Sequence, residues 1–159
     1  MVLALAAERT SRIGLGPGVL VPSLRHPMVN AAATAGLTEL APGRVALGVG
    51  SGFTGRLALG QRPMPWRDVE KYVRALRALL RGQDVEWDGA ATRMLHGNGF
   101  GAARPVEVPL LIAASGPKGL KVAGGLADGV FTTAGFLPDA RPLPWHAHLA
   151  YGTVIQDGE

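Results

Sequence analysis

Apolar residues recur along this chain at two spacings, one typical of helices and the other of strands. The clearest helical spacing lies in residues 69–80, between a proline before it and a glycine after it. Its apolar stripe consists of Val69, Tyr72, Val73, Leu76, Leu79 and Leu80. In residues 45–50 valine and leucine alternate with alanine and glycine, which predicts a strand with one bulky face and one bare face. The continuous apolar run 108–115 predicts a strand buried on both faces.

The remaining segments continue an alternation of strand and helix. Helices are predicted at 2–8, 27–41 and 117–127, and strands at 12–16, 130–135 and 148–155. The polar, glycine-rich residues 84–105 interrupt this order and predict a hairpin or loop outside the core. The alternation as a whole predicts an α/β fold with a mainly parallel sheet and helical crossovers.

Composition and charge narrow the class of protein. The chain of 159 residues is 47% hydrophobic and only 18% charged, which suits one folded domain or a piece of one. It has no cysteine, so disulfides, thiolate metal sites and a cysteine nucleophile are excluded. Its net charge of +4 comes from scattered basic residues, and no apolar run approaches the ~20 residues that cross a bilayer. We therefore expect no nucleic-acid or membrane partner, and a cytoplasmic location.

Three glycines follow a predicted strand in a pattern known from dinucleotide-binding proteins. Gly50, Gly52 and Gly55 match G-x-G-x-x-G. In a Rossmann fold the last glycine opens a helix, and an acidic residue ends the next strand about 20 positions later. Here two prolines delay the helix, and the acidic residues at that distance, Asp68 and Glu70, lie inside it. The pattern therefore predicts a strand end whose backbone closely approaches another group, and not a dinucleotide fold.

Two other strand ends are also built from small residues. Residues 14–19 (GLGPGV) follow the first predicted strand, and residues 113–118 (AASGPK) follow the long apolar one. In parallel α/β architectures ligands bind at the carboxyl ends of the strands. These turns predict a flat ligand that lies against the backbone. The alternative is that glycine and alanine only fill tight turns.

Five segments, taken in their order and spacing, resemble the luciferase-like flavin or deazaflavin oxidoreductases. They are TSRIGLGPGV (10–19), RHP (25–27), LAPGRVALGVGSG (40–52), VPLLIAASGP (108–117) and ADGV (127–130). GPGV followed by RHP is most similar to the branch that depends on coenzyme F420, such as methylenetetrahydromethanopterin reductase. The resemblance implies an eight-stranded (β/α) TIM barrel. Because such a barrel usually takes about 250 residues, residues 1–159 are expected to form a single incomplete barrel domain, roughly strands 3 to 7.

The resemblance also implies where a cofactor binds. A bulge after the third barrel strand, with a non-proline cis peptide behind the deazaflavin ring, falls on Gly18 and Val19. The loops after the fifth and sixth strands supply the other cofactor-binding residues, which are Ala113, Ala114, Ser115, Gly116, Thr133, Ala134 and Gly135. Phe136 stands where some relatives carry a basic residue for phosphate, which puts that contact in question. Lys118 and Lys121 either face an anionic cofactor or are simply exposed.

The function implied by the resemblance is hydride transfer between coenzyme F420 and a small organic substrate. An FMN-dependent monooxygenase is the alternative within the family, and a non-catalytic fragment or association subunit is the alternative from another class. No catalytic residue can be named, because the family's acid–base residues lie largely after the two missing strands. His146 and His148 lack a third ligand, so no metal site is expected, and His26 is expected to cap a turn. Open sheet edges predict self-association, which leaves a homodimer open.

Overall fold

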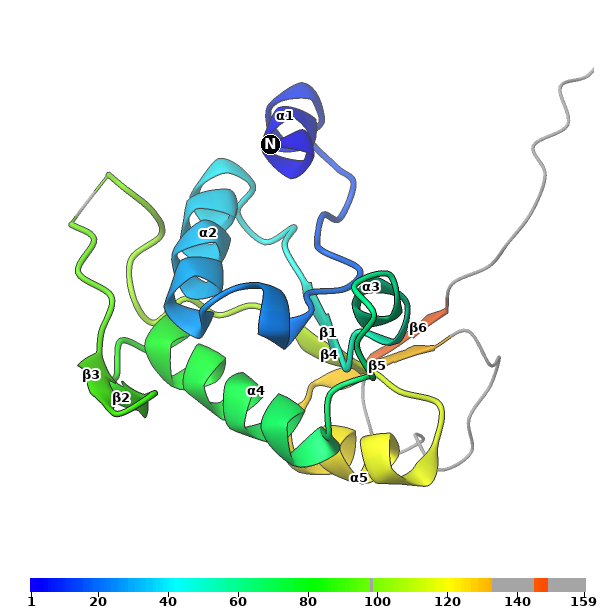
Figure 1. Ribbon diagram of the computed structural model, residues 1–159. Helices are drawn as coiled ribbons and strands as arrows, with labels where there is room; N and C mark the ends of the chain where they lie inside the picture. Colours follow the sequence, from blue (N-terminus) through cyan, green and yellow to red (C-terminus); the bar gives the residue numbers. More distant parts are fainter. Residues whose placement is uncertain (98, 133–144, 149–159) are drawn as a thin grey trace, which may run out of the picture.

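The computed structural model of the chain describes residues 1–97, 99–132 and 145–148. Their centre is a parallel four-stranded sheet in the order β1-β4-β5-β6 (Figure 1). Its strands are β1 (Leu47–Gly50), β4 (Leu110–Ala113), β5 (Gly129–Thr132) and β6 (Trp145–His148). Each strand lies beside the next one along the chain once the inserted hairpin β2–β3 is set aside. This is the winding of part of a (β/α) barrel, as the sequence predicted.

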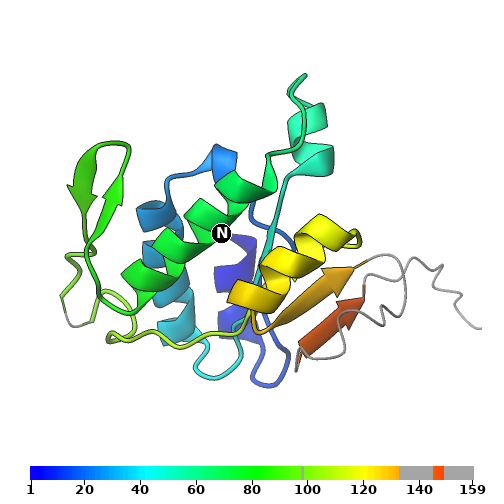
Figure 2. The same ribbon diagram turned by 90° about the horizontal axis from the view of Figure 1, so that it is seen from below.

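Four helices of at least eight residues accompany the sheet within the described residues. They are α1 (Val2–Arg9), α2 (Pro27–Leu40), α4 (Trp66–Leu80) and α5 (Pro117–Leu126). Helix α4 lies between α2 and α5 and contacts both, and α1 packs against α2 (Figures 1 and 2). At the start of α2 the backbone N–H of Met28 donates to Nδ1 of His26, 3.1 Å away, so His26 caps this helix as predicted.

The main hydrophobic core lies between the sheet and these helices. All six apolar positions of the predicted stripe on α4 are buried. They form one cluster with strand residues that include Leu47, Val49, Leu110, Ile112 and Val130. Full burial of a valine or leucine side chain stabilises the folded state by roughly 1.5–3 kcal/mol, so this stripe is what fixes α4 against the sheet.

The polar segment after α4 begins with a hairpin, as predicted, but the segment is not wholly outside the core, because Met94 is buried in the main cluster and Val85 and Trp87 pack against it. Strands β2 (Val85–Trp87) and β3 (Ala90–Thr92) pair antiparallel. Asp88 and Gly89, which join them, both have positive φ, at 51° and 81°. Such a two-residue turn matches the right-handed twist of a hairpin, and Asp-Gly is a favoured sequence for it. The Trp87 ring packs edge-on against Tyr72, with 5.7 Å between centroids, and thereby holds the hairpin against α4.

The strand predicted at residues 12–16 is not formed as a regular strand. The segment makes two isolated parallel bridges to the β1 region, Leu15 with Val45 and Leu20 with Val49. Between the two bridges this segment advances five residues, from 15 to 20, whereas its partner advances only four, from 45 to 49. One extra residue on this segment therefore bulges out between the bridges. Glycine and proline in this interval leave too few consecutive pairings for a ladder.

The carboxyl-terminal strands were predicted in part. Strand β5 confirms the start of the predicted strand 130–135, and residues 133–135 lie outside the described residues. The last strand was predicted at 148–155, but the described strand is β6, which ends at His148. Prolines interrupt the pattern of polar and apolar residues before β6, so the sequence did not show where this strand begins. Residues 149–155 lie outside the described residues.

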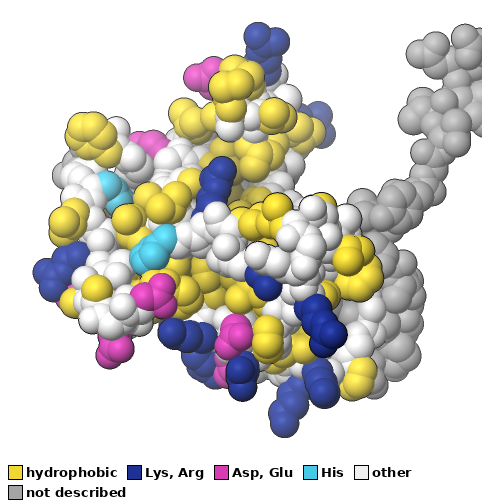
Figure 3. Space-filling model, viewed as in Figure 1, with side chains coloured by type: hydrophobic (Ala, Val, Ile, Leu, Met, Phe, Trp, Pro, Cys, Tyr) yellow, Lys and Arg dark blue, Asp and Glu magenta, His cyan; other side chains and the backbone are white. Residues whose placement is uncertain are grey.

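The surface agrees with a scattered distribution of charge. On the face shown in Figure 3, basic side chains are spread over several elements, with acidic side chains among them. Within the described residues, no helix combines the length and apolar character needed to cross a membrane.

Two glycines of α5 provide a matched test of this packing. A Cβ on Gly119 would lie 2.5 Å from Cζ2 of Trp66 and 2.6 Å from Cβ of Ala114, whereas a Cβ on Gly124 would meet nothing within 4 Å. Gly119→Ala should therefore lower the free energy of unfolding by about 1–3 kcal/mol. Gly124→Ala should raise it by up to about 1 kcal/mol, because alanine favours helix. Urea unfolding followed by circular dichroism measures both; equal effects would contradict the close contact of α5 with α4.

The buried side chain of Tyr72 predicts that the free energy of unfolding depends on pH in the alkaline range. Its ring is buried, and its hydroxyl accepts a hydrogen bond from Nδ2 of Asn30, 2.6 Å away. Burial raises the pKa of Tyr72 above its usual 10.0, although the bond from Asn30 and the charge of Arg25 oppose this shift. The folded chain thus retains a proton that the unfolded chain loses, so the unfolding free energy should fall as pH rises above 10.

The control for this prediction is Tyr72→Phe. Phenylalanine leaves the buried amide of Asn30 without its partner, which costs about 1–3 kcal/mol at every pH. The quantity to compare is therefore the loss of unfolding free energy between about pH 9 and pH 11, a range that spans the tyrosine titration. We expect a smaller loss in the variant than in the wild type, and identical losses would show that Tyr72 does not contribute.

Candidate functional site

The bulge opposite β1 is built from residues 15–20 and held by backbone hydrogen bonds at both ends. At one end the N–H of Ala46 donates to the carbonyl of Leu15, at 2.9 Å. At the other end the N–H of Leu20 donates to the carbonyl oxygen of Gly48, at 2.7 Å, and the N–H of Gly50 donates to the carbonyl oxygen of Leu20, at 3.0 Å. Between these bonds the peptide from Gly18 to Val19 is cis, as the resemblance implied.

The bare face of β1 accommodates this bulge. A Cβ on Gly48 would lie 2.9 Å from the carbonyl oxygen of Pro17, and a Cβ on Gly50 would lie 3.0 Å from Cγ2 of Val19. A Cβ on Gly16 would lie only 1.9 Å from the carbonyl oxygen of Ala46. The predicted alternation of bulky and bare residues is confirmed. The bare face is not open, however, because the bulge covers it and buries Gly48 and Gly50.

A cavity of about 710 Å³ opens at the carboxyl ends of β1, β4 and β5. Five of the predicted cofactor-binding residues line it, namely Gly18, Val19, Ala113, Ala114 and Ser115. Gly116 is the N-cap of α5 and is not part of the lining. Thr133, Ala134 and Gly135, and also Phe136, lie outside the described residues. The structure thus brings the bulge and the end of β4 together at one edge of the sheet.

Other residues of the lining were not among the predicted site residues. They are Val21, Gly50, Ser51, Gly52, Phe53, Thr54, Gly55, Trp66, Phe131 and Thr132. The glycine string 50–55 was a usable signal, because it marks a strand end where backbone is exposed to a neighbour. Trp66, Phe131 and Thr132 gave no such signal, since their patterns are those of ordinary helix and strand residues.

A helix that the sequence did not predict begins within the glycine string. Helix α3 (Phe53–Leu57) begins directly after Gly52, whose φ of 78° lies in the left-handed region. A side chain at Gly52 would also approach within 2.5 Å of Val21. The helix has only five residues, and the crossover to β4 is made by α4 after two prolines. A single turn is too short to show a helical spacing in sequence, which explains the omission.

The lining is polar in places but carries no charge within the described residues. Ser115 and Thr132 approach each other with 2.9 Å between their hydroxyl oxygens, so they join the ends of β4 and β5. Ser51 and Thr54 add further hydroxyl groups, and Val19, Val21, Phe53 and Trp66 add apolar surface. Lys118 and Lys121 are exposed and do not line the cavity. Of the two readings of these lysines, the described structure supports simple exposure.

Such a cavity suits a flat and largely uncharged ring system. Its volume falls in the range of about 300–1,000 Å³ typical of ligand pockets. Glycine and alanine in the bulge and at the ends of β1 and β4 let backbone groups approach a ring closely. Neutral hydroxyls can hydrogen-bond to ring carbonyls or hydroxylated chains. Within the described residues no cluster of three metal-binding side chains is found.

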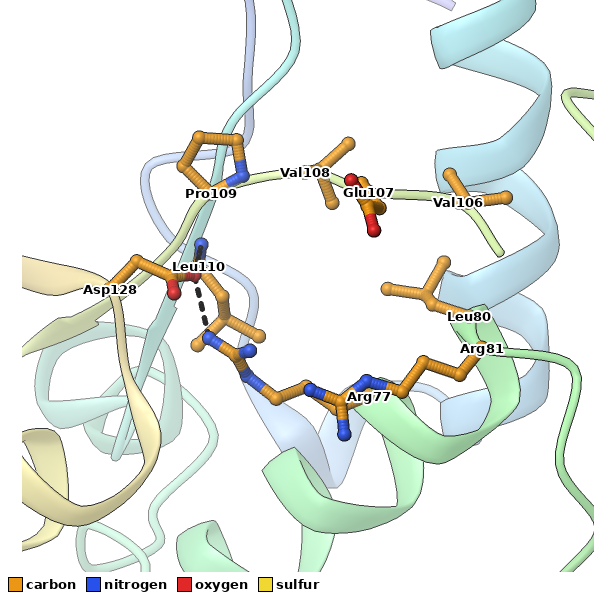
Figure 4. Close-up of a pocket in the computed structure, with 9 residues that line it drawn as sticks. All are labelled: Arg77, Leu80, Arg81, Val106, Glu107, Val108, Pro109, Leu110 and Asp128. Atoms are coloured by element: carbon orange, nitrogen blue, oxygen red, sulfur yellow. Dashed lines mark hydrogen bonds and ion pairs between the residues drawn. The ribbon is translucent and has the colours of Figure 1, made fainter. Parts of the chain in front are cut away.

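A separate cavity, of about 430 Å³, lies at the amino ends of β4 and β5 (Figure 4). Here Arg77 of α4 donates to the carboxylate of Asp128, with 2.6 Å between Nη2 and Oδ2. The same oxygen accepts from the backbone N–H of Leu110, at 2.8 Å, where β4 begins. This arrangement ties the end of α4 to the amino ends of β4 and β5. We therefore assign these charges to the stability of the sheet rather than to a cofactor.

Comparison with known proteins identifies the class. Residues 1–146 match the family model described as luciferase-like monooxygenase. The chain is 42% identical over 144 residues to the F420-dependent glucose-6-phosphate dehydrogenase of Beutenbergia cavernae, an alignment that covers 84% of this chain and 41% of that protein. The chain belongs to the luciferase-like monooxygenase family, and the predicted resemblance is confirmed.

Solved structures agree with the family and with the partial barrel. The coenzyme F420-dependent tetrahydromethanopterin reductase of Methanopyrus kandleri superposes with a TM-score of 0.66 at 29% identity, covering 83% of this chain and 43% of that one. An F420-dependent secondary alcohol dehydrogenase in complex with an F420-acetone adduct gives 0.65 at 26% identity, covering 82% and 41%. The chain therefore spans less than half the length of these relatives.

Proposed function

We propose that this chain forms the cofactor cavity of an F420-dependent oxidoreductase, as a single incomplete barrel domain over residues 1–159. The observation that carries the proposal is the Gly18–Val19 bulge, which lies on the glycine face of β1 at the rim of a cavity whose described lining has no charged side chain. The relatives support it, because F420-dependent enzymes are among those that share this chain's sequence and fold.

The residues that line the cavity are proposed to contribute to cofactor binding in different ways. Gly18 and Val19 form a backbone platform behind the ring, which Val19 can provide because its side chain is turned onto β1. Ala113 at the end of β4 and Ala114 and Ser115 directly after it line the cavity and present small side chains and backbone groups to the cofactor's edge. Gly116, the N-cap of α5, remains a predicted contact outside the lining. Thr133, Ala134 and Gly135 remain predicted contacts after β5. When bound, F420 supplies the chemistry of hydride transfer, while the protein supplies position and polarity.

The substrate is proposed to be a small organic molecule. Relatives are named for glucose-6-phosphate and for methylenetetrahydromethanopterin, and these differ widely in charge and size. The described lining presents no charged side chain, so it offers no ion-pairing partner to a phosphorylated substrate. The described lining is thus better suited to bind a planar ring than a sugar phosphate. Cytoplasmic location, self-association and a homodimer stay predictions.

Binding measurements on the purified chain test the proposal and its flavin alternative. F420 and FMN are titrated separately, and binding is followed by tryptophan fluorescence, because Trp66 lines the cavity. We expect F420 to bind at least about tenfold more tightly than FMN, a difference of about 1.4 kcal/mol. Tighter binding of FMN would favour the monooxygenase alternative. Binding of neither cofactor would favour a non-catalytic fragment and overturn the proposal.

Gly50→Ala tests whether the floor of the cavity matters for binding. The added methyl would lie 3.0 Å from Cγ2 of Val19 and 3.2 Å from Cβ of Ala113, so it must displace the bulge or the end of β4. F420 affinity should fall by about tenfold, as expected for a loss of about 1.4 kcal/mol. Gly124→Ala is the control, since its methyl meets nothing and lies outside the cavity. Equal affinities in the two variants would contradict the assignment of this cavity.

A further inference from the structure

Phe131 occupies a distinct position in the middle of the sheet. It lies on β5 opposite Ala113 of β4, between two residues, Val130 and Thr132, that are buried. Because side chains alternate along a strand, Phe131 points to the other face, where the bulge lies. A Cβ on Gly18 would lie 3.7 Å from Cζ and 3.9 Å from Cε2 of the Phe131 ring. The tip of the ring therefore faces Gly18, and a methyl group on Gly18 would be in ordinary van der Waals contact with it.

No other described group lies as near to Gly18 in the direction in which a side chain would project. Beyond the chain neighbours of Gly18, only these two ring atoms come within 4 Å of a Cβ built there. The flanking residues are held differently, since the carbonyl of Pro17 accepts from the N–H of Gly48, at 3.0 Å, and Val19 rests on Gly48 and Gly50. The bulge thus has a fixed start and end, and within the described residues the ring of Phe131 is the nearest side chain that faces its middle from this side.

Phe131 also separates two spaces on the inner face of the sheet. The cofactor cavity lies on one side, and on the other lies a cavity of about 480 Å³ lined by parts of segments 12–18 and 43–48 with Pro109 and Leu111. Gly18 and Phe131 are the two residues that line both. If the ring were removed, these spaces would merge beneath Gly18, and the bulge would lose the surface that keeps it out of the second cavity.

We propose that Phe131 is a positioning residue for the cofactor ring, and this inference rests on the proposed function. Phe131 acts through the bulge: its ring sets how far Gly18 and Val19 project into the cavity, and hence where the ring system of F420 comes to rest. A backbone platform contributes to binding only when its position is fixed in advance, because a platform that must be ordered on binding lowers the affinity.

The experiment compares three variants of the full chain. Phe131→Ala removes the support, and Phe131→Leu keeps an apolar side chain of reduced reach should the alanine variant not fold. Leu111→Ala is the matched control, because Leu111 is a buried residue of β4 that lines the second cavity but not the cofactor cavity. For each, the F420 dissociation constant, the absorption spectrum of bound F420 and the melting temperature are measured.

Phe131→Ala should weaken F420 binding by at least about tenfold and shift the spectrum of the bound cofactor, with Phe131→Leu intermediate. Leu111→Ala should lower the melting temperature but leave affinity and spectrum unchanged. Wild-type affinity and spectrum in both Phe131 variants would overturn the inference while the proposed function stands. An equal loss of affinity in Leu111→Ala would also overturn it, because the effect would then be general destabilisation. A wild-type chain that binds no F420 would overturn the proposed function, and the inference with it.

Discussion

The packing of the bulge at residues 16–19 on the glycine face of β1 is the constraint on which the site depends. The two backbones approach so closely that a side chain at Gly16 or Gly48 would collide with a carbonyl oxygen of the other segment. This approach lets the carbonyl of Pro17 bond to β1 and brings the side chain of Val19 against Gly48 and Gly50. At this point the cavity is lined by the backbone of Gly18 together with Val19.

As a result, one face of the sheet forms the hydrophobic core and the other face carries the bulge. On one face, which the helices cover (Figure 2), large apolar residues of β1, β4 and β5 form the main hydrophobic cluster with α4, and their burial stabilises the fold. On the other face, glycine and alanine make room for the bulge, with Phe131 as the large side chain beneath it. The two ends of the strands differ in the same way. The ion pair of Arg77 and Asp128 secures the amino ends, and the cavity occupies the carboxyl ends.

The neutral lining connects the fold with the proposed function. Members of this family share the barrel, and the cavity described here offers hydroxyl groups, apolar surface and backbone rather than charge. A ring system is recognised well by such a surface, because shape and hydrogen bonding specify its position without the cost of burying an ion. Selection of a charged substrate, by contrast, needs charged groups, and the described lining contains none of them.

The helices, the central strands and the hairpin followed from the sequence, because each has a local cause: the stripe of α4, the apolar run of β4, and the Asp88-Gly89 turn. The order of motifs also predicted the family and the position of the bulge. Three matters were decided only by tertiary structure. The expected strand at 12–16 became two bridges around an extra residue, α3 formed where no helical spacing exists, and Phe131 came to lie beneath Gly18. Each depends on contacts between segments far apart in the chain, and neither propensity nor spacing within a single segment carries that information.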